Sequence, residues 1–200
     1  MFKKEFDLFG IILGLIIGCV LGYFVFSQIQ IEDKSEDKVV ISEEIHGTIY
    51  SIQLGNSTNV SSLDLITNRL DVLGIYYQIY QEADKYYIFN SIYDNLEKAQ
   101  TQKQIMESYG FNVTIRSDYI LDLPNTLISS TDEYNFYCEA INNLLNSLKE
   151  EEIIISEIYY TNPVNIEIFS NLTVLKKIKK NEIKSNYQID TFCLLLNKLK

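Results

Sequence analysis

The stretch Thr48-Ile-Tyr-Ser-Ile-Gln-Leu54 decides the fold class of this chain. Its side chains alternate between a more apolar and a more polar set, and β-branched and aromatic residues are frequent in it. Both features are typical of a half-buried strand. The alternation assigns the side chains to two faces, Tyr50, Ile52 and Leu54 against Ile49, Ser51 and Gln53. Since the packed face of a sheet needs the more apolar set, we expect Ser51 and Gln53 on the open face.

Helical and extended segments follow this strand in a βαββαβ order. Gly74 and Gly110 are expected to end the two helices. The expected elements are a helix capped by Ser61 or Ser62, strands over 76–80 and 86–89 joined by a turn at 82–85, a helix capped by Asp94 or Asn95, and a strand over 111–115. This order predicts an α+β fold of the ferredoxin-like or RNP-like kind, in which a four-stranded antiparallel sheet carries both helices on one face and leaves the other face open.

The third expected strand places aromatic residues on the open face. Alternation buries Tyr86 and Ile88 and exposes Tyr87 and Phe89. Aromatic residues on strands often serve packing, but two rings beside a glutamine and a serine also form a candidate platform for a ligand. The candidate binding residues are Ser51, Gln53, Tyr87 and Phe89.

Several segments resemble the SPOR (sporulation-related repeat) domain, a bacterial peptidoglycan-binding module. They are Tyr50-Ser-Ile-Gln-Leu-Gly-Asn-Ser57, Gly74, Lys85-Tyr-Tyr-Ile-Phe89, Tyr93-Asp-Asn-Leu-Glu-Lys-Ala99 and Gly110-Phe-Asn-Val113. The resemblance covers residues 46–117 and implies a non-catalytic domain that binds glycan strands stripped of stem peptides through its open sheet face. It also implies an envelope location at sites of cell division, wall remodelling or sporulation.

The sequence departs from the SPOR pattern directly after the third strand. Where the family often has Val-Gly-Pro-Phe, this chain has Asn90-Ser91-Ile92-Tyr93. Without that glycine and proline, we expect a different turn at this point.

The N-terminal segment predicts a membrane anchor. Residues 8–31 are 24 consecutive uncharged residues, long enough as a helix to cross a ~30 Å hydrocarbon core. Lys3 and Lys4 precede the span, so we expect a cytoplasmic tail over 1–7 and extracytoplasmic C-terminal domains. An alternative is lipidation at Cys19, because Ile16-Ile-Gly-Cys19 resembles a lipobox.

Glycines recur every fourth residue within the expected span, at Gly10, Gly14, Gly18 and Gly22. Such stripes allow two membrane helices to approach closely. Association with a second copy or with a membrane partner is one interpretation, and the general frequency of glycine in membrane helices is the other.

Residues 32–45 read as a polar linker, 46–119 as the SPOR-like domain, and 120–200 as a mainly helical region of unknown role. Helices are expected over 131–148, 165–181 and 187–199, with Thr131 or Asp132 as the cap of the first. Residues 153–160 fit either a strand or a helical turn. The basic run Lys176–Lys180 fits a solvated helix face better than a site for an anionic partner.

Composition excludes several classes of function. The net charge of −10, from 17 Lys+Arg against 27 Asp+Glu, opposes nucleic-acid binding, and so also opposes RNA recognition by aromatics on a similar sheet. A single histidine, His46, and three scattered cysteines leave no metal site or catalytic triad to assemble. We therefore expect no enzyme activity and no cofactor.

The sequence thus predicts a single-pass membrane protein that binds peptidoglycan glycan strands. The alternative is an envelope structural or assembly protein that acts through protein contacts without binding glycan.

The glycine stripe yields a direct test. Replacing Gly14 and Gly18 with Leu should force paired membrane helices apart and weaken self-association in a membrane reporter assay. An unchanged reporter signal would mean that these glycines do not form a helix contact.

Overall fold

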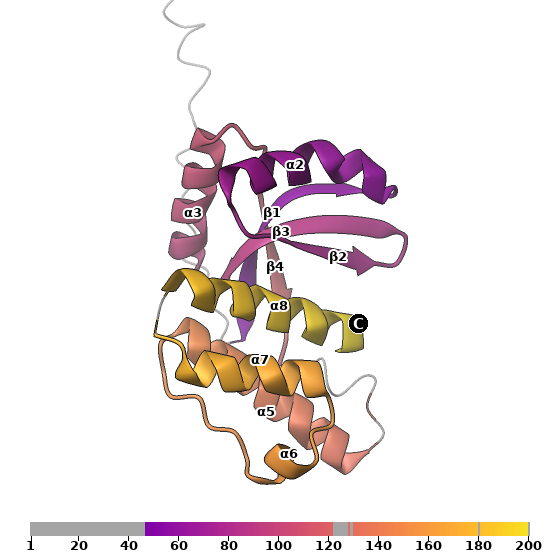
Figure 1. The fold of residues 1–200 in the computed structure, drawn as a ribbon, viewed down its shortest axis with the longest axis vertical. Coiled ribbons are helices and arrows are strands. Elements are labelled where there is room, and N and C mark those ends of the chain that lie inside the picture. Colours follow the sequence, from indigo (N-terminus) through magenta and orange to yellow (C-terminus); the bar gives the residue numbers. More distant parts are fainter. Residues whose placement is uncertain (1–46, 122–127, 129, 180, 200) are drawn as a thin grey trace, which may run out of the picture. The chain divides into compact units, whose positions relative to one another are not determined.

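The computed structural model describes residues 47–121, 128, 130–179 and 181–199, and it confirms the α+β architecture (Figure 1). The described residues belong to one compact unit. Their elements are β1 (Thr48–Ser57), a 3₁₀ helix (Val60–Leu63), α2 (Asp64–Leu73), β2 (Gln78–Glu82), β3 (Lys85–Tyr93), α3 (Leu96–Ser108), β4 (Thr114–Tyr119), α5 (Thr131–Leu148), α6 (Ile158–Thr161), α7 (Ile166–Lys177) and α8 (Asn181–Leu199).

The four strands form one antiparallel sheet in the order β2-β3-β1-β4. The expected βαββαβ order is confirmed, and so is the hairpin turn between β2 and β3. The fourth strand was placed too early, over 111–115. It begins at Thr114, because pairing with β1 runs from Gln53 opposite Thr114 to Thr48 opposite Tyr119, whereas Phe111 and Val113 are buried before the strand begins.

Short polar side chains and glycines set the helix ends. Asn95 accepts hydrogen bonds from the first turn of α3, as expected, whereas Ser61 and Ser62 cap nothing: Asn59 caps the 3₁₀ helix that leads into α2. Gly74 and Gly110 have φ of 65° and 79° and end α2 and α3, which confirms their predicted role.

The C-terminal helices also begin at side-chain caps. Ser130, rather than Thr131 or Asp132, caps α5, and Asn165 caps α7. Helix α8 begins at Asn181, earlier than the expected residue 187. Residues 153–160 contain no strand, and the short helix α6 begins at Ile158.

Two apolar cores lie on opposite faces of the sheet. The first core joins β1 and β3 to α2 and α3, which therefore share one face, and contains Tyr50, Ile52, Leu54, Leu63, Leu70, Ile88, Ala99, Met106, Phe111 and Val113. The second core joins the other face to α5, α7 and α8, and contains residues such as Ile49, Tyr80, Phe89, Ile120, Phe136, Leu144, Ile168 and Phe192. Figure 1 shows α8 beside the sheet, with α7 and α5 beyond it.

The expected membrane span, its glycine stripe and the linker fall on residues 1–46, outside the described part of the chain. Among the residues that are described, no helix has the length and apolarity needed to cross a membrane.

Phe192 tests the importance of the second core. Its side chain is fully buried, so Phe192→Ala should lower the free energy of unfolding by about 3–5 kcal/mol, measured by urea denaturation of a 43–200 fragment. Asn197→Ala, on the exposed side of the same helix, is the matched control and should change it by less than about 0.5 kcal/mol. Equal effects of the two variants would contradict this packing.

Candidate functional site

The four predicted binding residues share one sheet face, but that face is not open. Alternation placed them correctly: Phe89 lies in the second core and Tyr87 packs against it, on the opposite side from Tyr50, Ile52 and Ile88. Their expected exposure was wrong. The exposed fraction is 0% for Ser51 and Phe89 and 9% for Gln53, and Tyr87 is half-buried. Glycan binding by these residues stays a prediction, and it would require an accessibility that this structure does not provide.

Helix α8 is the element that covers the face. The ring of Phe192 lies 6.3 Å from that of Phe89, centroid to centroid, and Phe89 in turn stacks on Tyr80 at 5.8 Å. The covering side chains of α8 are all essentially buried: Ile189, Phe192, Leu195, Leu196 and Leu199. The apolar stripe predicted for the C-terminal helix therefore lies in the core that the sheet shares with α5 and α7, and Phe192 is its contact with Phe89 of the sheet.

Arg116 provides the charged part of this face, and sequence reasoning missed its role. Its guanidinium lies over the rings of Tyr87, Tyr80 and Phe89, at 5.2, 5.8 and 5.8 Å from their centroids. It also forms ion pairs of 2.9 Å with Asp118 and with Glu82. The sequence did carry a signal for this ion pair: Arg116 and Asp118 are two residues apart in β4, so both side chains lie on the same face of the strand.

The ion pairs keep Arg116 charged at this half-buried position. Burial by itself lowers the pKa of the guanidinium, but the hydrogen bonds and negative charges of Asp118 and Glu82 outweigh burial and raise it. Ser51 is engaged as well, because its hydroxyl donates to the carbonyl of Arg116 at 3.4 Å. The Ser51 hydroxyl therefore has its hydrogen-bond partner inside the fold.

Asp190 fixes α8 to the edge of the sheet. Its carboxylate accepts hydrogen bonds from the Tyr76 hydroxyl at 2.8 Å and from the Gln78 amide at 2.6 Å. Burial raises the pKa of Asp190, although both hydrogen bonds act in the opposite direction. Burial and the Asp190 hydrogen bond raise the pKa of Tyr76 to about 12.

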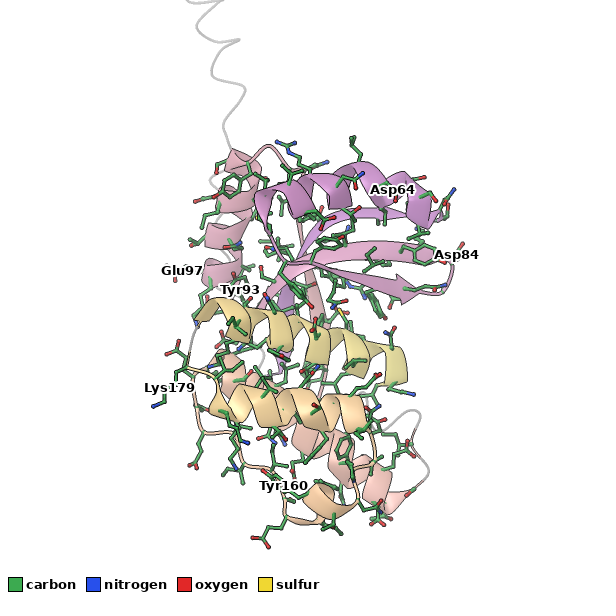
Figure 2. The ribbon with its side chains drawn as sticks, in the orientation of Figure 1. Asp64, Asp84, Tyr93, Glu97, Tyr160 and Lys179 are labelled. Atoms are coloured by element: carbon green, nitrogen blue, oxygen red, sulfur yellow. The ribbon has the colours of Figure 1, made fainter. Side chains whose placement is uncertain are left out.

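Two cavities lie where α8 meets the end of β3. The larger measures about 590 Å³ and is lined by Gly74, Tyr76, Asn90, Ser91, Tyr93, Gln102, Ile183, Ser185 and Asn186; we call it the seam cavity. Figure 2 labels Tyr93 close to the first turns of α8. The smaller measures about 270 Å³ and shares Tyr93 and Ser185 with it.

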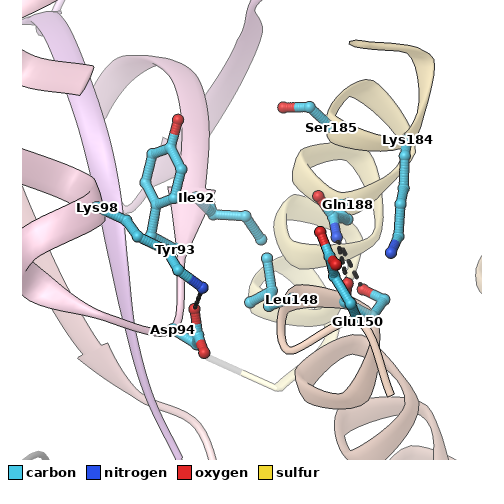
Figure 3. A pocket seen from close by; sticks show the side chains of 10 residues that line it. Ile92, Tyr93, Asp94, Lys98, Leu148, Glu150, Lys184, Ser185 and Gln188 are labelled. Carbon is cyan, nitrogen blue, oxygen red and sulfur yellow. Dashed lines mark hydrogen bonds and ion pairs between the residues drawn. The ribbon is translucent and has the colours of Figure 1, made fainter. Parts of the chain in front are cut away.

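The smaller cavity carries charges of both signs (Figure 3). Lys98 pairs with Asp94 at 3.1 Å, and Glu150 and Lys184 line the opposite side. The Gln188 amide donates to the carbonyl of Ser147 at 2.9 Å, which joins α8 to α5. Both acidic and basic groups thus surround this cavity, which gives it no preference for a ligand of one charge.

The remaining candidates add no chemistry to this region. Cys138 and Cys193 are free thiols, and burial raises the pKa of Cys193. Within the described residues no cluster of His, Cys, Asp and Glu could hold a metal ion. Lys176, Lys177 and Lys179 of the basic run are exposed.

Comparison with known proteins adds no family: no family model, no curated protein and no solved structure matches this chain.

The raised pKa of Asp190 predicts a pH effect. A carboxyl whose folded pKa lies above its unfolded value costs stability at neutral pH, and that cost disappears as the pH falls through the folded pKa. Asp190→Asn keeps an acceptor oxygen and removes the charge, so it should be at least as stable as the wild type at pH ~7 and should flatten the change in stability between pH ~7 and ~4. Urea unfolding midpoints across this range measure it.

Two further variants complete that test. Asp190→Ala, which loses both hydrogen bonds, should lower stability by about 1 kcal/mol. The exposed Asp71→Asn should leave the pH dependence unaltered. If the stability of the Asp190→Asn variant changes with pH as that of the wild type does, the raised pKa of Asp190 does not cause the pH effect.

Proposed function

We propose that this chain is a membrane-anchored envelope protein whose SPOR-like module uses its sheet face to hold its own C-terminal helices, and which acts through protein contacts. The observation that carries the proposal is the burial of Phe89 beneath Phe192. A face filled in this way serves as an internal interface.

Energetics argue against a sheet face that opens to bind glycan. Five large apolar side chains of α8 are buried in the core between the sheet, α5 and α7, and burying each contributes about 1.5–3 kcal/mol, so exposing the whole stripe would cost on the order of 10 kcal/mol. A ligand with a Kd of about 1 μM supplies only about 8 kcal/mol. Glycan binding of that strength would not displace the helix.

An exposed apolar surface supports protein contacts. Five exposed large apolar side chains lie in and around α6, where Figure 2 labels Tyr160. The exposed members, all between residues 154 and 166, are Ile154, Ile158, Tyr160, Val164 and Ile166. Exposed apolar side chains that lie close together often mark a site of protein association.

Peptidoglycan binding is the second candidate, favoured by the SPOR-like signature Tyr50–Ser57 and by the expected membrane anchor. In that case a surface other than the covered sheet face would contact the glycan.

Pelleting with cell-wall sacculi separates the two candidates. A 43–200 fragment should not pellet preferentially with amidase-treated sacculi, and Gln53→Ala should change nothing in this assay, because the Gln53 side chain is buried. Preferential pelleting of the wild type with amidase-treated sacculi that falls about two- to tenfold in Gln53→Ala would instead establish glycan binding on the sheet face.

A further inference from the structure

The exposed apolar side chains between residues 154 and 166 belong to a segment that is otherwise anchored in the fold. Their exposed fractions range from 42% to 71%, whereas Ile153, Ile155 and Tyr159 of the same segment lie in the second core. Figure 1 shows α6 next to α5 and α7, away from the sheet. We call the exposed set the α6 surface; its members are Ile154, Ile158, Tyr160, Val164 and Ile166.

Side chains of α5 fix the backbone that carries Ile154. The Asn143 amide donates to the Ile154 carbonyl at 2.7 Å, and the Asn143 side-chain oxygen accepts from the Ile154 N–H at 2.9 Å. Asn143 is only 2% exposed, so a buried side chain holds this residue at both its backbone groups. Two residues later, Ser156 donates its N–H, at 2.8 Å, and its hydroxyl to the Glu139 carboxylate. Ile154 is therefore presented on a preorganised backbone, and preorganisation lowers the entropy cost of binding a partner.

The part of the chain around the α6 surface is strongly acidic. Residues 131–175, from the start of α5 almost to the end of α7, contain eight Asp or Glu and one cation, Lys149. Glu157 directly precedes α6, and Glu167 lies in the first turn of α7. Both side chains are exposed, and each is adjacent in sequence to an isoleucine of the α6 surface.

Two carboxylates of α5 also lie near α6. Burial raises the pKa of Tyr159 in α6, and the negative charges of Glu139 and Asp132 raise it further. The α6 surface is therefore accompanied by carboxylates from α5 as well as by those next to it in the sequence.

The apolar side chains and the negative charge together select the partner. A second copy of this chain would bring the same carboxylates against one another, and like charges that face each other across an interface cost free energy. A membrane with anionic lipids would be repelled for the same reason. A protein segment that carries Lys or Arg beside apolar side chains can cover the isoleucines and pair with the carboxylates at the rim.

We propose that the α6 surface binds a cationic amphipathic segment of a partner protein, with Ile154 and Ile158 as apolar contacts and Glu157 and Glu167 as charged contacts. This inference rests on the proposed function, because it names the kind of partner for the protein contacts proposed above. The two can fail separately, since sacculus pelleting does not depend on the α6 surface.

Peptide binding to the full-length chain tests the surface. The chain is placed in phosphatidylcholine nanodiscs, one copy per disc. The probe, called the Lys peptide, is a labelled amphipathic peptide of ~18 residues with Leu on one helix face and Lys on the other. Fluorescence anisotropy should show saturable binding with a Kd of about 1–100 μM, after subtraction of binding to empty discs. The Glu peptide, with Glu in place of each Lys, should bind at least about tenfold more weakly.

The apolar contacts are tested by matched variants. Ile154→Ser and Ile158→Ser should each weaken binding of the Lys peptide about three- to tenfold, because each removes an apolar side chain from the interface. Leu65→Ser and Val72→Ser remove aliphatic side chains of α2 that are even more exposed, and they should leave the affinity within about twofold. All four side chains are at least 64% exposed, so thermal melting should show that each variant is folded.

The charged contact has an equally close control. Glu167 and Glu97 each lie in the first turn of a helix, two residues after an Asn cap. Glu167→Gln should weaken binding of the Lys peptide about two- to fivefold, and this loss should shrink as salt is added. Glu97→Gln should change the affinity by less than about 1.5-fold. Equal effects of the two variants would overturn the proposal.

Two other occupants would be recognised in the same samples. Light scattering detects discs that pair, and pairing that Ile158→Ser abolishes would identify a second copy as the occupant. Ile158→Trp adds the chain's only tryptophan, and quenching of its fluorescence by brominated lipid would place the surface on the membrane. Either result would overturn the proposal, as would no binding of the Lys peptide, equal binding of the Glu peptide, or equal losses in Ile158→Ser and Val72→Ser.

Discussion

The packing of Phe192 on Phe89 is the contact on which the rest of this structure depends. It lies within a layer in which every apolar side chain of the covering stripe of α8 is buried. Because that layer contributes energy of the order of a whole domain's stability, ~5–15 kcal/mol, the sheet and the C-terminal helices form one folding unit. Separating them exposes both the aromatic strand residues and the helix stripe to water.

A sheet face with charged and polar residues can be covered only if those groups find partners. Arg116 pairs with Asp118 and Glu82 and spreads over three rings, so its charge lies between carboxylates and aromatic faces. Asp190 accepts its two hydrogen bonds at the other edge. These pairs offset the desolvation that α8 imposes. The two hydrogen bonds of Asp190, which join α8 to Tyr76 and Gln78, also orient the helix on the sheet in a way that apolar contacts alone do not.

Local sequence signals predicted the sheet and the face to which each strand residue points. They did not predict that α8 packs on the sheet, because that contact joins distant parts of the chain. Alternation in β1 gave the correct face for Gln53, and Gly74 ended its helix as expected, because each depends on neighbouring residues only. The apolar stripe that includes Phe192 was visible too. Nothing in the sequence paired it with Phe89, more than 100 residues away, since any two apolar faces are compatible in composition. The start of β4 at Thr114 likewise follows from pairing with β1 rather than from its own pattern.

The bulge at Asn90 and Ser91 in β3 affects both the covered core and the seam cavity. The bulge lets both Phe89 and Ile92 point into the second core, although a regular strand would send residues three apart to opposite faces. The same extra residue turns Asn90 to the Tyr76 carbonyl and the Gln102 amide. One local irregularity of β3 therefore adds an apolar contact to the covered core and also forms a polar wall of the seam cavity.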